Sequence, residues 1–176
     1  MSTGPAITDD FPPVNEPVVF DASALLCRYL PDKRGPLVDQ VLDSSAYPAV
    51  TAPARAEVML GLQLAVDRSR PGRAGQGELW SWLAADWNRF WVLPVSVGGA
   101  DGVRAAELGA RYGLNLANAL HLVAMERLPR PAWLLTFDDR QVVAAVDLGF
   151  GIVETTLSIP GRSTAHGLLV EPTSRP

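Results

Sequence analysis

The sequence predicts an α/β protein, with a three-layer α/β/α domain built around a mostly parallel central sheet. Short apolar runs typical of buried strands alternate with longer segments whose apolar residues recur at helical spacing. The connections between them are short, as in parallel sheets that helices cover on both faces. With 176 residues, 48% of them hydrophobic, the chain can build one core but is too short for two comfortable domains.

The first half of the chain begins with a buried-type strand over residues 18–20, and a helix follows over 22–30. A second helix is expected over 36–42, because its apolar residues lie on one face. A strand over 49–51 then leads into a long helix that Pro53 is suited to open as a first-turn residue. This helix is apolar on several sides, so we expect it to be well buried.

A tryptophan-rich helix begins the second half, and strands and helices then alternate to the end of the domain. These elements are expected as strands over 90–95, 133–137 and 152–153, and as helices over 101–112, 116–127 and 140–148. We expect the domain to span residues 17–156, between a flexible lead-in over 1–16 and a C-terminal tail over 157–176. No internal repeat is evident.

The amino-acid composition excludes several classes of protein and of metal site. The single cysteine, Cys27, excludes a disulfide framework, and with only two histidines any metal site must rely on oxygen ligands. The formal net charge of −4 argues against a protein that coats duplex nucleic acid, but it is compatible with a carboxylate-rich nuclease site. We expect no membrane-spanning segment and no secretory signal, and therefore a cytoplasmic protein.

Polar side chains follow two of the predicted strands. Asp21 and Ser23 come after the first strand, while Thr136, Asp138 and Asp139 come at the end of the fourth. Ligands of open parallel sheets bind outside the carboxyl ends of the strands. The sequence therefore predicts a polar site at this edge of the sheet.

Two helices can add ligands to that site. Glu57 lies in the first turns of the helix after the second strand, and Asn118 lies three residues before His121, on one helical face. Mg²⁺ and similar hard cations prefer such oxygen ligands, and converging carboxylates need a cation to offset their repulsion. Two such ions would be able to hydrolyse a phosphodiester.

Each of these residues also has a structural interpretation. An aspartate after a strand is often only the N-cap of the next helix. Glu57 would be explained by an ion pair with Arg55 or Arg111, and His121 by a packed, hydrogen-bonded position in its helix. Taken together, the residues favour a metal site over these separate explanations.

The same segments, VVFDASALL, ARAEVMLGL, LNLANALHLVAMERL and LLTFDDRQVVAAVDLGFGIVE, resemble the PIN domain in their order and spacing. The likeness is greatest to the VapC-like toxins of bacterial toxin–antitoxin pairs, and it covers residues 17–155. The resemblance implies an α/β/α ribonuclease that depends on Mg²⁺ or Mn²⁺, usually a homodimer, and held inactive by a cognate antitoxin.

The resemblance also implies the ligands. It places Asp21, Glu57 and Asp138 at the metal, with the hydroxyls of Ser23 and Thr136 nearby. The position of the family's third acid is occupied here by Asn118, whose amide can coordinate a cation but brings no charge. Three explanations remain open: a degenerate domain, a weak enzyme in which Asp139 or another acid compensates, or a deliberate replacement of aspartate.

Three functions follow as hypotheses. The first is an endoribonuclease toxin that cuts RNA with metal held by Asp21, Glu57, Asn118 and Asp138. The alternative is a PIN-fold module that binds RNA or protein without cutting, which Asn118 favours. A weaker third hypothesis is a metal-dependent phosphatase or DNA nuclease.

Five aromatic residues lie within a short segment: Trp80, Trp82, Trp87, Phe90 and Trp91. We predict that they belong to the core. The competing interpretation is an exposed surface for dimerisation or for an antitoxin helix or strand.

The loop over 68–77 carries Arg68, Arg70 and Arg73. We interpret these arginines as part of a solvated loop, with steering of RNA phosphates as the alternative. Its GRAGQG segment does not follow a strand, so we do not interpret it as a phosphate-binding loop.

Overall fold

The computed structural model of the protein describes residues 16–67 and 76–153. The expected tail, all of the expected lead-in except Glu16, and the arginines of the 68–77 loop lie outside these ranges. Within them, no helix is long and apolar enough to cross a bilayer.

A five-stranded, all-parallel sheet forms the middle of the molecule. Its order is β3-β2-β1-β4-β5, which places β1 at the centre. The strands are β1 (Pro17–Phe20), β2 (Tyr47–Thr51), β3 (Trp91–Leu93), β4 (Trp133–Leu135) and β5 (Gly151–Ile152).

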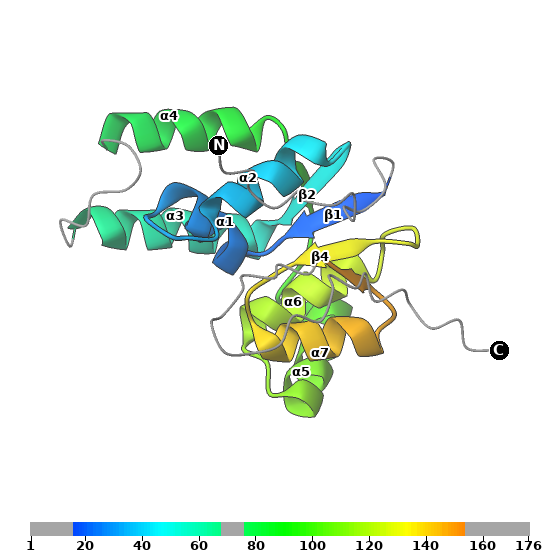
Figure 1. The fold of residues 1–176 in the computed structure, drawn as a ribbon. Helices are drawn as coiled ribbons and strands as arrows, with labels where there is room; N and C mark the ends of the chain where they lie inside the picture. The colour runs from blue at the N-terminus through cyan, green and yellow to red at the C-terminus, as the bar shows by residue number, and fades with distance from the viewer. Residues whose placement is uncertain (1–15, 68–75, 154–176) are drawn as a thin grey trace, which may run out of the picture.

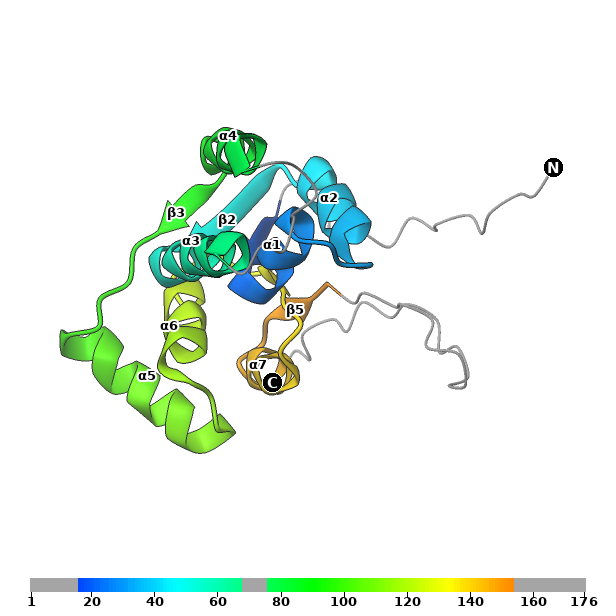
Figure 2. The same cartoon turned by 90° about the vertical axis from the view of Figure 1, so that its left-hand side faces the viewer.

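Seven helices cover the two faces of this sheet within the described ranges (Figures 1 and 2). The first group packs on the face presented by Phe20 and Val50, and it consists of α1 (Ala22–Tyr29), α2 (Gly35–Ser44), α3 (Ala52–Asp67) and α4 (Gln76–Trp87). The second group packs on the face presented by Val19 and Leu134, and it consists of α5 (Gly99–Tyr112), α6 (Leu116–Met125) and α7 (Asp139–Asp147). The predicted three-layer α/β/α class is confirmed.

Two of the predicted strands end two residues earlier than expected. The strand predicted over 90–95 stops at Leu93, because Pro94 has no N–H to continue a ladder. The strand predicted over 133–137 stops at Leu135. Beyond it, hydroxyl groups accept the backbone N–H bonds, with Phe137 donating to Ser23 Oγ (3.0 Å) and Asp138 donating to Thr136 Oγ1 (3.2 Å).

The expectation that α3 is buried on several sides is wrong. Val58 and Leu62 are buried against the core, but Leu60 is 60% and Leu64 42% exposed. The helix packs on one side, against α1, α6 and β2. Its outward leucines form part of the rim of the pocket described below.

The aromatic cluster divides between core and surface, so the prediction of a core cluster is wrong for three of its members. Phe90 is buried and meets Phe20 edge-to-face at 5.4 Å between ring centroids. In contrast, Trp80, Trp82 and Trp91 are 38%, 43% and 56% exposed. The reason is that α4 lies outermost on its face and β3 is an edge strand.

A buried ionic contact attaches α4 to the rest of its layer. Asp86 of α4 accepts hydrogen bonds from Arg28 (2.8 and 3.1 Å) and from the Tyr29 hydroxyl (2.6 Å). Burial, and then the contact with Asp86, raise the pKa of Tyr29 well above its usual value, so the phenol stays a neutral donor. Because Arg28 also pairs with Asp39 of α2, this contact joins three helices.

Candidate metal centre

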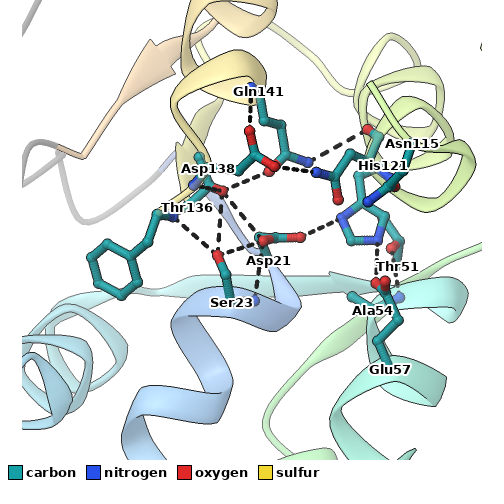
Figure 3. A network of polar contacts seen from close by, with 12 residues as sticks. Asp21, Ser23, Thr51, Ala54, Glu57, Asn115, His121, Thr136, Asp138 and Gln141 are labelled. Carbon is teal, nitrogen blue, oxygen red and sulfur yellow. Dashed lines mark hydrogen bonds and ion pairs between the residues drawn. The ribbon is translucent and has the colours of Figure 1, made fainter. Parts of the chain in front are cut away.

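A pocket of about 390 Å³ lies at the carboxyl edge of the sheet, where β1 and β4 end beside α3 and α6. Five of the polar residues that the sequence analysis selected line it: Asp21, Ser23, Glu57, Asn118 and Asp138. They come from segments more than a hundred residues apart, and parallel β1–β4 pairing brings them together (Figure 3).

Asp21 sits at the floor of the pocket as the N-cap of α1 and is 2% exposed. Its Oδ2 accepts hydrogen bonds from Ser23 N (3.1 Å), Ser23 Oγ (2.6 Å) and Thr136 Oγ1 (3.2 Å). Burial raises the pKa of this carboxyl, but the charged ring of His121 and the Ser23 bonds outweigh burial and lower the pKa to about 2. Asp21 is therefore a fixed negative charge.

His121 lies between Asp21 and Glu57 and is completely buried. Its Nδ1 is 2.7 Å from Asp21 Oδ1, and its Nε2 is 3.4 Å from Glu57 Oε2. These are ion-pair distances, yet among the described residues none of the four atoms makes a well-directed hydrogen bond. Burial lowers the pKa of His121, but the two carboxylates outweigh it and raise the pKa to about 9.

Glu57 reaches the pocket from the second turn of α3. Neither of the two arginines that the sequence offered as ion-pair partners contacts it, since Arg55 lies over the Trp87 ring and Arg111 pairs with Asp147. The side chain of Glu57 is 38% exposed, with Oε2 directed inward to His121. An ion pair with either arginine therefore does not account for this acid.

Asn118 and Asp138 face each other across the pocket. The amide Nδ2 of Asn118 donates to Asp138 Oδ2 at 2.7 Å. Asp138 is also the N-cap of α7, since its Oδ1 accepts from the N–H groups of Arg140 (2.9 Å) and Gln141 (3.1 Å). Lining the pocket and capping α7 were predicted as alternatives for Asp138. The two oxygens of its carboxylate allow both.

Gln141 is a site residue that the sequence analysis missed. It is fully buried, and its Oε1 accepts a hydrogen bond from Thr136 Oγ1 at 2.6 Å. Its Nε2 approaches the Asn118 carbonyl at 3.4 Å. Asp138 followed three residues later by glutamine is the pattern of a capping box, but the Asp138 N–H donates to Thr136 Oγ1 and not to Gln141, so this pattern does not predict the contacts of Gln141.

His121 was predicted to be a packed, hydrogen-bonded helix residue in preference to a ligand or base, and its position between two acids was not predicted. Asp139 was offered as an acid that compensates for Asn118, but it is exposed on the first turn of α7 and does not line the pocket. Successive residues at a helix start point in different directions, so the side chain of Asp139 is directed away from that of Asp138.

Thr136 does not line the pocket but contacts a residue that does, because its hydroxyl donates a hydrogen bond to Asp21 Oδ2.

The donor set fits a divalent cation. One ligand atom each from Asp21, Glu57 and His121 lies within 4.8 Å of the others. Two of these residues are buried, and their facing polar atoms lack well-directed hydrogen bonds among the described residues. Buried polar atoms are normally satisfied, so an inward-facing set of this kind is typical of a site that binds a ligand.

Fold and site together define an α/β/α domain with an all-parallel sheet and an acidic pocket at the carboxyl ends of its strands. No protein-family model and no curated protein match the chain. Among solved structures it resembles PAE2754 from Pyrobaculum aerophilum, at 17% identity and a TM-score of 0.55, covering 73% of this chain and 79% of that one. It also resembles a chain of a toxin–antitoxin complex from Klebsiella pneumoniae, at 18% identity and a TM-score of 0.50, covering 86% and 99%.

Proposed function

We propose that the protein is a divalent-metal-dependent endoribonuclease of the VapC-like kind, with activity weakened by Asn118. The observation that carries this proposal is the convergence of Asp21, Glu57 and Asp138 from β1, α3 and α7 on one pocket. The facing atoms of the buried pair Asp21 and His121, which make no well-directed hydrogen bond with the described residues, add to it. We expect this activity in the cytoplasm, on RNA.

The residues of the pocket have distinct roles in this proposal. Asp21, Glu57 and Asp138 hold Mg²⁺ or Mn²⁺, with the Asn118 amide oxygen as a neutral ligand. When bound, the cation activates water and stabilises the leaving oxygen of a phosphodiester. Ser23 and Thr136 fix the orientation of Asp21 by hydrogen bonds to Oδ2. Because Asn118 lacks a charge, the site attracts the cation less strongly than one with a further acid.

We expect the chain to cleave structured RNA slowly with Mn²⁺ and not at all with EDTA. The test compares RNA, single-stranded DNA, duplex DNA and a phosphomonoester, each with Mn²⁺, Mg²⁺ or EDTA. Glu57→Gln should remove the cleavage, because it deletes one ligand charge while keeping the size of the side chain. Cleavage that persists in EDTA or in this variant would sink the proposal, and preference for DNA or the monoester would replace it with the third hypothesis.

A second candidate is a PIN-fold module that binds RNA or protein without cutting. The Asn118–Asp138 hydrogen bond favours it, since the amide satisfies Asp138 without any cation. RNA binding of equal strength in Mn²⁺ and EDTA, with no cleavage by the chain or by its Asn118→Asp variant, would select this function.

We also propose that the protein forms a homodimer and binds an antitoxin, as a toxin would. The exposed tryptophans of α4 and β3 support a protein-contacting surface, because tryptophan is enriched at interface hot spots. A chain of the toxin–antitoxin complex from Klebsiella pneumoniae has a similar fold, which supports a partner of this type.

Replacing Trp80 and Trp82 together by serine is expected to weaken the homodimer at least tenfold, by loss of aromatic contact area. Sedimentation equilibrium of the full chain measures this. Val143→Ser, at a residue 61% exposed on α7, is the matched control for loss of exposed apolar surface. A native chain that sediments as a monomer would contradict the dimer, and an unchanged dimer in the tryptophan variant would contradict this surface.

A further inference from the structure

His121 has an unusual environment for a core histidine. It is completely buried in a helix whose one other polar side chain is Asn118, and both ring nitrogens face carboxylates rather than backbone groups. Within the described residues neither nitrogen makes a well-directed hydrogen bond. A buried imidazole normally has a hydrogen-bond partner on at least one nitrogen, so packing alone does not account for this position.

The two ring nitrogens lie at different distances from their carboxylates. Nδ1 is 2.7 Å from Asp21 Oδ1, whereas Nε2 is 3.4 Å from Glu57 Oε2. The second separation is long for a hydrogen bond. Two ligands of one ion, each bound at about 2.0 to 2.2 Å, lie roughly 3 to 3.5 Å apart in tetrahedral or octahedral geometry. The separation of Nε2 and Glu57 Oε2 therefore matches that of two ligands of one ion.

The shorter contact, between Nδ1 and Asp21 Oδ1, also fits a histidine that binds a metal through its other nitrogen. Histidines that ligate metals almost always direct their other ring nitrogen to a carboxylate or carbonyl, which fixes the tautomer and the ring orientation. Asp21 is placed for this role by its hydrogen bonds to Ser23 and Thr136. Without a metal, a proton on Nε2 fills the gap between the ring and Glu57.

We propose that His121 is a nitrogen ligand of the metal centre, binding through Nε2 beside Glu57 while Asp21 orients the ring through Nδ1. This inference rests on the proposed metal site and adds a ligand to it. Imidazole suits transition metals such as Mn²⁺ and Zn²⁺, whereas Mg²⁺ prefers oxygen. The centre therefore selects Mn²⁺ over Mg²⁺, and His121 determines that selectivity.

The direct test is electron spin-echo envelope modulation of Mn²⁺ bound to the full chain. Protein grown with ¹⁴N-histidine should show nitrogen modulation that changes when ¹⁵N-histidine is used. The chain has one other histidine, His166, so His166→Ala should retain the signal and thereby assign it to His121. Bound Mn²⁺ without this modulation would overturn the inference, and the measurement needs no substitution at the buried site.

Calorimetric titration with Mn²⁺ and with Mg²⁺ provides the second test. In His121→Asn, the amide nitrogen can replace Nδ1 opposite Asp21, but nothing replaces Nε2. We expect the Mn²⁺ affinity to fall at least about tenfold and the Mg²⁺ affinity to change less than about threefold. An equal loss for both ions would show a merely structural role and overturn the inference.

The two proposals fail separately. Nitrogen-coupled Mn²⁺ in a protein that cuts no RNA would support the His121 ligand and overturn the ribonuclease. RNA cleavage by a Mn²⁺ ion without nitrogen coupling would do the reverse. Neither readout of the His121 test uses enzymatic activity.

Discussion

Replacing Asn118 with aspartate is expected to raise Mn²⁺ affinity at least tenfold and to accelerate RNA cleavage at least tenfold, about 1.4 kcal/mol of barrier. Asn118 Nδ2 lies 2.7 Å from Asp138 Oδ2, so the new carboxylate would face Asp138 directly. Two carboxylates this close repel each other, and a divalent cation between them removes that repulsion. The measurements are calorimetric titration with Mn²⁺ and cleavage of a structured RNA pool.

The same substitution should destabilise the metal-free protein. It removes the hydrogen bond to Asp138 and introduces a like charge, together costing about 1 to 2 kcal/mol, or roughly 2 to 8 °C in Tm for a chain of this size. Added Mn²⁺ should restore the Tm, because binding stabilises only the folded state. Thermal unfolding in EDTA and in Mn²⁺ measures both effects.

Asn115→Asp is the matched control for this variant. Asn115 also lines the pocket, and its side chain caps α6 through Asn118 N at 2.8 Å. Aspartate caps helices as well as asparagine does, so this variant adds charge without opposing Asp138. Its Tm in EDTA should stay within about 2 °C of the native value. Equal effects of the two variants would contradict the role assigned to the Asn118–Asp138 pair.

Replacing Asp21 with asparagine should weaken Mn²⁺ binding at least a hundredfold and abolish cleavage, including cleavage by the Asn118→Asp variant. Asp21 is the buried carboxylate of the site, and it supports His121 as well as facing the pocket. Losing a buried ligand charge costs more than losing an exposed one, because little solvent screens it. Asparagine remains a good N-cap for α1, so the fold should persist, which circular dichroism checks.

Asp139→Asn provides the comparison for this loss. It removes one negative charge from a neighbouring acid that is exposed on α7 and outside the pocket. We expect Mn²⁺ affinity and cleavage within about twofold of the native chain, since exposed charges are screened by salt. A comparable loss in both variants would mean that net charge, rather than a built site, attracts the ion.

The fold class was predictable because local patterns and chain connectivity agree. Buried strands such as Val18–Phe20 are short apolar runs, and the helices between them carry an apolar face. Parallel connection then places the residues after β1 and β4 at one edge of the sheet. For this reason the sequence pattern is sufficient to place Asp21 and Asp138 at the same edge.

The direction of individual side chains was not predictable. Helical spacing puts Asn118 and His121 on one face of α6, but it does not say what lies opposite that face. Only the packing of α6 against α3, beside the end of β1 where Asp21 lies, sets His121 between Asp21 and Glu57. The solvent-facing tryptophans of α4 have the same cause, because an apolar residue type does not reveal which side of an outer helix remains uncovered.

The sequence by itself therefore determined the layers of this protein, the order of its elements and the edge where its acids gather. The tertiary structure decided which residues meet there: His121 lies between two carboxylates, the Asn118 amide donates a hydrogen bond to Asp138, and Asp139 faces outward. The physical reason is that strand and helix periodicity are local properties of the chain. The rotation of each helix about its axis is fixed only by packing against segments distant in sequence.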